Sequence, residues 1–204
     1  MRTSPAIGLE RAYAALELDI RLRELPLGAR VRGVWFHMNG DEISRHGRDV
    51  QAAFHAATGG RSRWAFLLYD LRDYLVETAA AAALINPDDP REGVRTIWRN
   101  AVRYSKFMHP GTFLRLLRPD PKEALAWLVR NRDHFASFGA WRLEERAVDY
   151  AVVHMIDELV WIAWAQRGGA EGFLDACGAD GSVEVETIDR YRGRLHLRWK
   201  RRAS

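Results

Sequence analysis

Cysteine is nearly absent from this sequence, which has a single cysteine, Cys177, in 204 residues. A lone cysteine excludes an internal disulfide and every zinc site that is built on paired cysteines. The N-terminus from Met1 to Pro5 lacks the apolar core of a signal peptide. No apolar run approaches the ~18 residues of a membrane-spanning helix. These absences favour a cytoplasmic protein without a membrane span.

Lysine is also scarce. Lys106, Lys122 and Lys200 are the only lysines among 31 basic residues, so the other 28 are arginines. The basic residues are interleaved with 27 acidic ones, and the net charge is only +4. An electrostatic footprint for nucleic acid needs clustered charge, and the one cluster, residues 200–202, is short. We therefore expect no nucleic-acid partner.

Motifs of nucleophilic and phosphate chemistry are missing. There is no Gly-x-Ser-x-Gly elbow, and Cys177 lies between Ala176 and Gly178 with no evident base, as expected for a buried core thiol. The glycine-rich run at 168–172 is not followed by Lys-Ser/Thr, so it does not indicate a phosphate cradle. We expect that the protein is not an enzyme.

Seven histidines show no pair at the helical spacing of metal ligands, so no metal site is predicted. His109 is the exception to watch, because it ends a predicted helix beside Phe107 and Met108, where an apolar pocket could use it. The adjacent acidic pairs at 144–145 and 157–158 are expected to lie on the wet surface.

Residues 1–28 are predicted to form an N-terminal extension with a candidate strand. In residues 15–24, apolar and charged side chains alternate, which indicates a half-buried strand, although a helix that starts near Gly8 could extend into it. Residues 31–38 carry apolar side chains on both faces, as in a central strand that is covered on both sides.

Four or five helices are predicted next. Each segment has apolar residues at helical spacing and a glycine or proline at its end. The predicted helices cover residues 41–57, 64–85, the segment between Asp89 and His109, 112–117 and 122–138.

The last third of the chain returns to strand patterns. Residues 141–155 predict one long, bent strand or two short ones, and residues 157–177 predict a helix that breaks near Gly168-Gly169. Together with the hairpin described next, they predict an α+β fold. An antiparallel sheet of four to five strands packs against four to six helices, and residues 29–204 form a single ligand-binding-like domain.

The terminal hairpin has the clearest pattern, because residues 182–188 and 194–200 alternate apolar and charged side chains. A loop at residues 189–193 would pair Ile188 with Arg194. That register sets Val183 opposite Trp199 on the buried face and, on the wet face, Glu186 opposite His196.

Aromatic residues are abundant, with eight tryptophans and eight phenylalanines. Ligand sites are concave and lined with aromatic side chains, so these residues favour a hydrophobic cavity. Alternatively, these aromatic residues belong to a core that is rich in aromatic side chains, or to an oligomer interface. The candidate ligand-binding residues are Trp35, Trp98, Phe107, His109, Trp127, Trp161 and Trp164.

From about Val31 onward, sparse apolar and glycine markers resemble an uncharacterised family known mainly from myxobacteria, which would make the protein bacterial. The matching pieces are residues 31–36, 83–87, 95–107 with Gly111, and 169–178 with the terminal hairpin and Trp199. That family is similar in layout to the superfamily of haem-nitric-oxide sensors, four-vinyl-reductase-like ligand domains and TRAPP vesicle-tethering subunits. The resemblance implies an α+β domain around a lipid- or tetrapyrrole-sized cavity.

The chain departs from the haem branch of that superfamily. The haem branch carries a Tyr-x-Ser-x-Arg signature, whereas this sequence has only Tyr104-Ser105-Lys106, which lacks the spacing and the arginine. The departure argues against haem and against a metal, and the cofactor stays unknown.

Two functions are expected from these observations. The first is a non-enzymatic small-molecule-binding or sensory domain that holds a hydrophobic ligand in an aromatic-lined cavity. The alternative is a homodimeric protein-interaction or adaptor module without a ligand, with Trp161 and Trp164 at its interface.

Overall fold

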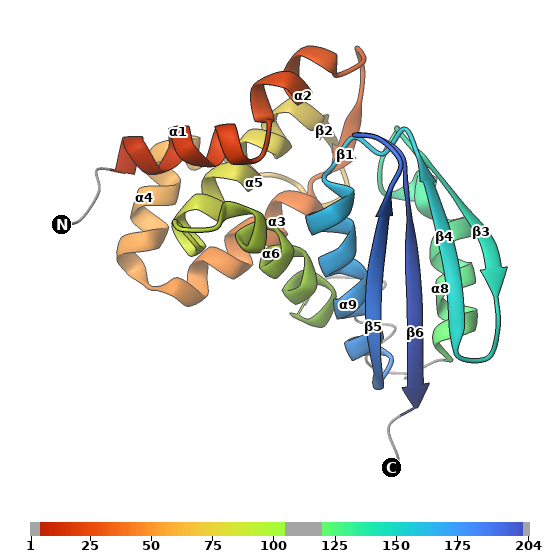
Figure 1. The fold of residues 1–204 in the computed structure, drawn as a ribbon. Coiled ribbons are helices and arrows are strands. Elements are labelled where there is room, and N and C mark those ends of the chain that lie inside the picture. Colours follow the sequence, from red (N-terminus) through yellow and green to blue (C-terminus); the bar gives the residue numbers. More distant parts are fainter. Residues whose placement is uncertain (1–4, 105–119, 202–204) are drawn as a thin grey trace. The chain divides into compact units, whose positions relative to one another are not determined.

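The computed structural model describes residues 5–104 and 120–201 (Figure 1). The chain forms two compact units, Met1–Ile97 and Trp98–Ser204, so the boundary falls inside helix α6 (Pro90–Tyr104). Residues 1–28 belong to the first unit, and residues 29–204 are divided between the two. Within the described residues, no helix combines the length and the apolar character needed to cross a bilayer.

The first unit is mainly helical, and its centre is α5 (Leu71–Ile85). The Asp70 carboxylate caps α5 by accepting a hydrogen bond from the Arg72 N–H group (2.8 Å). Small side chains at residues 79–83 are buried and let neighbouring helices approach closely. At Gly93 of α6 an added Cβ would lie 2.5 Å from the Ala82 carbonyl oxygen, so this contact requires glycine.

Four other helices and a small sheet surround α5 in the first unit. Strands β1 and β2 pair antiparallel, with Val31 opposite Tyr69. The elements are α1 (Pro5–Ala15), α2 (Leu18–Glu24), β1 (Arg30–Arg32), α3 (Val34–Ile43), the 3-10 turn Ser44–His46, α4 (Arg48–Thr58) and β2 (Leu68–Asp70).

The strand predicted at residues 15–24 is wrong, because this segment is the end of α1 followed by α2. Glu17 adopts a left-handed conformation (φ 51°) that breaks the helix, so Leu16 and Leu18 on either side are both fully buried. Their spacing of two therefore imitates a strand. The alternative prediction, a helix that runs into this segment from near Gly8, is the better one.

The central strand predicted at residues 31–38 is also wrong beyond Arg32. The chain turns at Gly33, where an added Cβ would lie 2.1 Å from the Trp64 carbonyl oxygen, and then enters α3. Trp35, Phe36 and Ile43 are buried on this helix. A short apolar run does not distinguish a buried helix from a buried strand.

The remaining helix predictions in this half are confirmed in part. Residues 41–57 contain the end of α3 and most of α4. Residues 64–85 begin with a loop and β2, and only the part from Leu71 onward is helix α5. The helix predicted after Asp89 is confirmed as α6. The one predicted at residues 112–117 lies outside the described residues.

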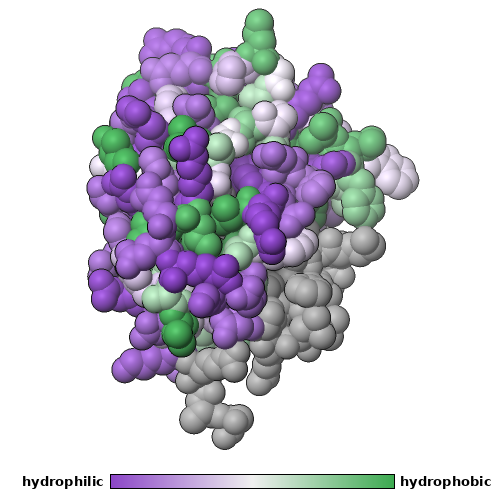
Figure 2. Space-filling view, turned by 90° about the vertical axis from the view of Figure 1, so that its right-hand side faces the viewer, coloured by the Kyte–Doolittle hydropathy of each residue, from purple (hydrophilic) through white to green (hydrophobic). Residues whose placement is uncertain are grey.

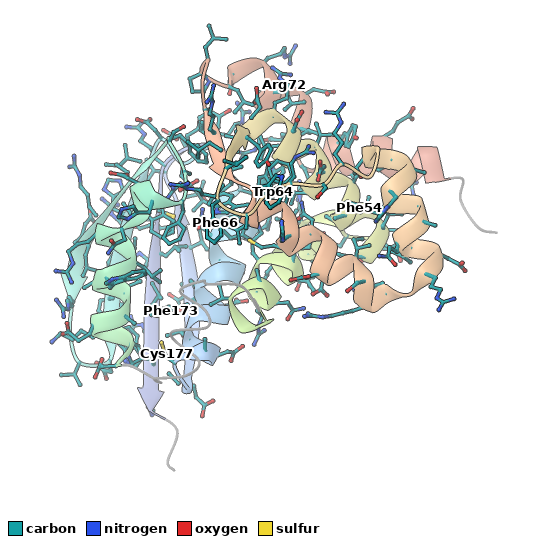
Figure 3. The ribbon with its side chains drawn as sticks, turned by 180° about the vertical axis from the view of Figure 1, so that it is seen from behind. Phe54, Trp64, Phe66, Arg72, Phe173 and Cys177 are labelled. Carbon is teal, nitrogen blue, oxygen red and sulfur yellow. The ribbon has the colours of Figure 1, made fainter. Side chains whose placement is uncertain are left out.

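The second unit is an antiparallel sheet in the order β3-β4-β6-β5, covered by helices α8 and α9. The core between sheet and helices contains Phe173 and Cys177 near the sheet (Figure 3), and Leu125 from α8. The elements are α8 (Pro121–Arg130), the 3-10 turn Arg132–His134, β3 (Ala140–Arg146), β4 (Tyr150–Ile156), the π-helical turn Ile162–Gln166, α9 (Arg167–Ala176), β5 (Ala179–Thr187) and β6 (Gly193–Arg201).

The predicted α+β class with a four-stranded antiparallel sheet is confirmed. Residues 141–155 form two strands, which is one of the two predicted alternatives. The helix predicted at 122–138 ends at Arg130, and the one predicted at 157–177 begins at Ile162.

The outward face of the sheet is charged. Arg194 donates hydrogen bonds to Glu144 (2.7 Å) and to Glu186 (3.0 Å), and the bond from Arg194 lowers the pKa of Glu144. Figure 2 looks onto the side that carries β3 at the right of Figure 1, and hydrophilic residues cover most of it. The predicted surface position of the pair Glu144-Glu145 is confirmed.

The predicted hairpin is confirmed, but its register is wrong by two residues. Val183 lies opposite Leu197 and Glu186 opposite Arg194, and Gly181 is the partner of Trp199. The turn is set by Asp189, which accepts hydrogen bonds from the Tyr191 N–H group (2.9 Å) and the Arg192 side chain (2.6 Å). A shift of two keeps every side chain on its predicted face.

We predict that Trp199→Ala lowers the free energy of unfolding by about 3–5 kcal/mol, because Trp199 is only 4% exposed in the core. Arg198→Ala on the exposed face of the same strand is the matched control and should cost under about 1 kcal/mol. Urea denaturation of both variants measures the difference. The reverse order of stability would contradict the assignment of the two faces.

Candidate ligand site

A buried polar cluster of the second unit lies just beyond the end of β4 and is centred on Glu158. Its fully buried carboxylate accepts hydrogen bonds from Arg132 Nη2 (3.1 Å) and from the indole Nε1 of Trp141 (2.7 Å). The Arg132 guanidinium lies 5.1 Å from the ring centres of both Phe138 and Trp141. A buried carboxylate is costly unless it is paired and hydrogen-bonded, so these contacts are what keeps Glu158 inside.

The prediction that Asp157-Glu158 lies on the wet surface is therefore wrong for Glu158, although Asp157 is exposed. Asp157 has a left-handed backbone (φ 52°), which ends the alternation of the strand and turns the next side chain inward. The Glu158 N–H group then donates to the Tyr191 carbonyl (2.9 Å). Left-handed non-glycine residues of this kind cluster at functional sites.

A π-helical turn at Ile162–Gln166 follows, in which the Gln166 N–H group donates to the Trp161 carbonyl five residues earlier (3.1 Å). Such turns are rare in proteins, and where they occur they are often found at functional sites. The Gln166 side chain is 3% exposed, and its amide nitrogen Nε2 is buried with no hydrogen-bond partner among the described residues. A buried donor without a partner costs about 1–3 kcal/mol, so a ligand that offers an acceptor here would relieve that cost.

The predicted site residues fall in both units of the chain and in the segment outside the described residues. Trp161 is fully buried and Trp164 half-buried at the π-helical turn, Trp98 is buried, and Trp127 on α8 is 38% exposed. All four belong to the second unit, whereas Trp35 belongs to the first. Phe107 and His109 lie outside the described residues.

Two glycines of the run at 168–172 explain how α9 packs against the end of α6 inside the second unit. An added Cβ would lie 3.3 Å from the Trp98 ring at Gly169, and 2.2 Å from the Arg99 carbonyl oxygen at Gly172. Arg99 also pairs with Asp175 (3.1 Å). These two glycines of the run thus allow the helices to pack closely.

A second buried arginine organises the first unit. Arg63 Nη2 bonds Glu77 (3.0 Å), and the guanidinium lies 4.7 Å from the ring centre of Phe36 and 5.3 Å from that of Tyr69. Burial raises the pKa of Glu77 to about 7, although Arg63 acts to lower it. Trp35 packs edge-to-face on Tyr74 beside this cluster, with ring centres 5.3 Å apart.

The chemistry available at Cys177 is limited. The thiol is buried in the core, and burial together with the charge of Asp120 raises its pKa to about 12. The thiolate is the reactive form of cysteine, so this side chain is inert near neutral pH. The predicted core role of Cys177 is confirmed.

Most of the described histidines contact a polar group through a ring nitrogen. Four of them face polar partners: His37 contacts the Arg63 carbonyl, His46 contacts Glu42, His154 contacts Glu144, and His196 contacts Tyr150. The other two, His55 and His134, are exposed. No group of three or more metal-ligating side chains occurs in the described part of the chain. His109, the histidine that the sequence singles out, lies outside the described residues.

The family now follows from the sequence match. The chain belongs to the DUF2378 family, described as proteins of unknown function. The match covers residues 27–200, which agrees with the extent of the predicted resemblance. A comparison with curated proteins found no match.

Solved structures of H-NOX proteins share the fold. The Fe(II) unliganded H-NOX protein from K. algicida has a TM-score of 0.64 at 12% identity, over 85% of this chain and 98% of that chain. The H-NOX protein from S. oneidensis in the Fe(II)NO state has 0.57 at 10% identity, over 83% and 99%. A mutant H-NOX protein from T. tengcongensis has 0.53 at 14% identity, over 81% and 95%. At identities this low, the comparison shows a common fold and nothing more. The predicted similarity to haem-nitric-oxide sensors is therefore confirmed as a likeness of fold.

Sequence reasoning missed both arginine clusters and Gln166. Arg132 and Glu158 are 26 residues apart, and Arg63 and Glu77 are 14 apart, so no local spacing connects them. The one signal for the first pair was an arginine, a tryptophan and an acidic residue beside predicted strand ends, which is too common a pattern to single out.

We predict that removing one partner of the Arg132–Glu158 pair costs more than removing both. Glu158→Gln should lower the free energy of unfolding by about 3–5 kcal/mol, because the guanidinium stays buried without its counter-charge. The double variant Arg132→Met, Glu158→Gln should recover part of that loss. Urea denaturation gives the values, with exposed Glu184→Gln as control. A Glu158→Gln variant as stable as Glu184→Gln would refute the structural role of the pair.

We also predict that the stability of the protein depends on pH through Glu77. The pKa of Glu77 is raised from 4.5 to about 7 in the folded chain, so folding favours its protonated form. Its contribution to stability is fully present below pH 4.5 and is lost as the pH rises through about 7. The stability of the wild type relative to Glu77→Gln should therefore decline between these pH values. A difference that does not change with pH would show that Glu77 ionises normally.

Proposed function

We propose that this protein is a non-enzymatic, ligand-binding sensory domain, and that a hydrophobic small molecule with one hydrogen-bond acceptor binds beside Gln166. The fold supports a sensory role, because the similar H-NOX structures include an unliganded Fe(II) state and an Fe(II)NO state, and one concerns haem distortion in that family. Haem itself is not part of the proposal, because the sequence lacks the Tyr-x-Ser-x-Arg signature of the haem branch.

The observation that carries the proposal is the buried Gln166 amide. It lies in a π-helical turn between the fully buried Trp161 and the helix α9. The neighbouring side chains Trp161, Ile162 and Ala165 in the chain are buried and apolar. In ligand sites, a few polar groups among apolar side chains fix the orientation of the ligand. A carbonyl or carboxylate oxygen of the ligand would accept from Gln166 Nε2.

The absence of enzymatic activity is part of the same proposal. The pKa of the Cys177 thiol is too high for nucleophilic catalysis, and the Glu158 carboxylate is engaged by Arg132 and Trp141. A site that offers one neutral amide donor supports binding more than proton transfer or nucleophilic attack.

The test uses oleate as a probe, because it combines an apolar chain with one carboxylate. Native mass spectrometry of the purified full chain should detect a bound molecule or saturable oleate binding. Gln166→Leu should weaken oleate binding about tenfold, the equivalent of one hydrogen bond. Gln51→Leu on the exposed face of α4 is the control and should bind as the wild type does.

Stability separates loss of the ligand contact from loss of the fold. Gln166→Leu removes a buried donor without a described partner, so its free energy of unfolding should stay equal or rise. A native mass without any bound molecule, together with no saturable oleate binding, would overturn the proposal. So would equal oleate affinities of the two variants.

A homodimeric adaptor is the second candidate, and the exposed Trp127 on α8 favours it. Trp161 does not, since it is fully buried. Light scattering that shows a dimer, and a monomer for Trp127→Ser, would support this role. A bacterial source, the myxobacterial origin and a cytoplasmic location stay predictions from the sequence.

A further inference from the structure

The segment between α4 and β2 displays apolar side chains to solvent. Trp64 is 76% exposed, Phe66 63% and Leu67 57%, and Leu68 at the start of β2 is 44% exposed. Figure 3 labels Trp64 and Phe66. Large apolar side chains that are exposed side by side mark an interaction site more often than single ones do. We call residues 64–68 the aromatic loop.

The backbone of the aromatic loop is hydrogen-bonded to its own unit. The donors and acceptors that hold it are Gly33 N–H to the Leu67 carbonyl (2.9 Å), Val34 N–H to the Ala65 carbonyl (3.0 Å), Leu67 N–H to the Trp64 carbonyl (3.2 Å), Trp64 N–H to the Tyr69 hydroxyl (2.7 Å), and the Arg32 side chain to the Phe66 carbonyl. These polar backbone groups would not need water if the loop entered an apolar phase.

Arg63 anchors the base of the aromatic loop. Its buried guanidinium pairs with Glu77 (3.0 Å) and Asp73 (3.6 Å), and its carbonyl contacts His37 Nε2 (2.8 Å). The loop is thus fixed from below while its apolar side chains point outward. A fixed loop loses little conformational entropy when it binds.

The aromatic loop and the strand beside it carry cationic side chains, and the nearby acids Asp73 and Glu77 are paired with Arg63. Residues 59–69 contain Arg61 and Arg63 and no acidic residue, and β1, the partner of β2, contributes Arg30 and Arg32. The neighbouring acid Asp70 is the cap of α5. Arg30 and Arg61 are exposed. Exposed aromatic and leucine side chains beside cationic ones are the combination that binds anionic membrane surfaces.

We propose that the aromatic loop docks the protein on the surface of an anionic lipid bilayer. Trp64, Phe66 and Leu67 enter the headgroup boundary, and Arg30 and Arg61 face the anionic headgroups. A second copy of the chain fits the loop less well, because a two-fold contact would bring the arginines of both copies together. This docking is independent of the ligand proposed at Gln166, which lies in the other unit.

The test is co-sedimentation of the full chain with vesicles of phosphatidylcholine alone or with about a quarter phosphatidylglycerol. The wild type should bind the anionic vesicles and be released at about 0.5 M salt, which screens the arginines. The double variant Trp64→Ser, Phe66→Ser should bind at least about tenfold more weakly, because it removes the inserted apolar area. Arg61→Glu should weaken binding to the anionic vesicles only.

Val148→Ser is the matched control, because Val148 is 80% exposed but lies in the turn between β3 and β4 of the other unit. It should bind as the wild type does, and the thermal unfolding midpoints of all variants should agree. No binding of the wild type, equal binding to both vesicle types, or no effect of the double variant would overturn the proposal. A dimer that the double variant converts to a monomer, without vesicle binding, would identify a second copy as the occupant and also overturn it.

Discussion

The buried pair of Arg132 and Glu158 is the contact on which the second unit depends. Arg132 comes from the turn after α8, Glu158 follows β4, and Trp141 on β3 donates to the same carboxylate. The Glu158 carboxylate therefore links the end of β4 and strand β3 to the turn that follows α8. The π-helical turn with Gln166 begins four residues after Glu158, so its position is set from this point.

The same arrangement occurs among the described residues of both units. In the first unit Arg63 lies against Phe36 and Tyr69 and pairs with Glu77, and in the second unit Arg132 lies against Phe138 and Trp141 and pairs with Glu158. Planar guanidinium groups suit this role because they stack on rings and still donate in their own plane. Arg63 holds the base of the aromatic loop. Arg132 holds Glu158, which precedes the π-helical turn with Gln166.

The sequence predicted the structure correctly where apolar residues recur at a regular spacing along a buried face. It did not where the backbone departs from a regular helix or strand. The faces of the terminal hairpin were predictable from alternation, but its register depended on the Asp189 turn. The left-handed backbone at Glu17 explains why the strand predicted at residues 15–24 is wrong. The left-handed backbone at Asp157 explains why Glu158 is buried and not on the surface. Of the candidate site, the tryptophans were predictable from their abundance, whereas Gln166 depends on a π-helical turn that no spacing of residues signals.

The most direct measurement is a ¹H–¹⁵N spectrum of the side-chain amides during titration with oleate. The chain has two glutamines, the exposed Gln51 and the buried Gln166, so the two signal pairs can be assigned by substitution. We predict that the Gln166 amide signals shift on binding, because a buried donor acquires an acceptor, while those of Gln51 stay in place. Unchanged Gln166 signals at saturating oleate would contradict the central claim that this amide is the polar contact of the ligand.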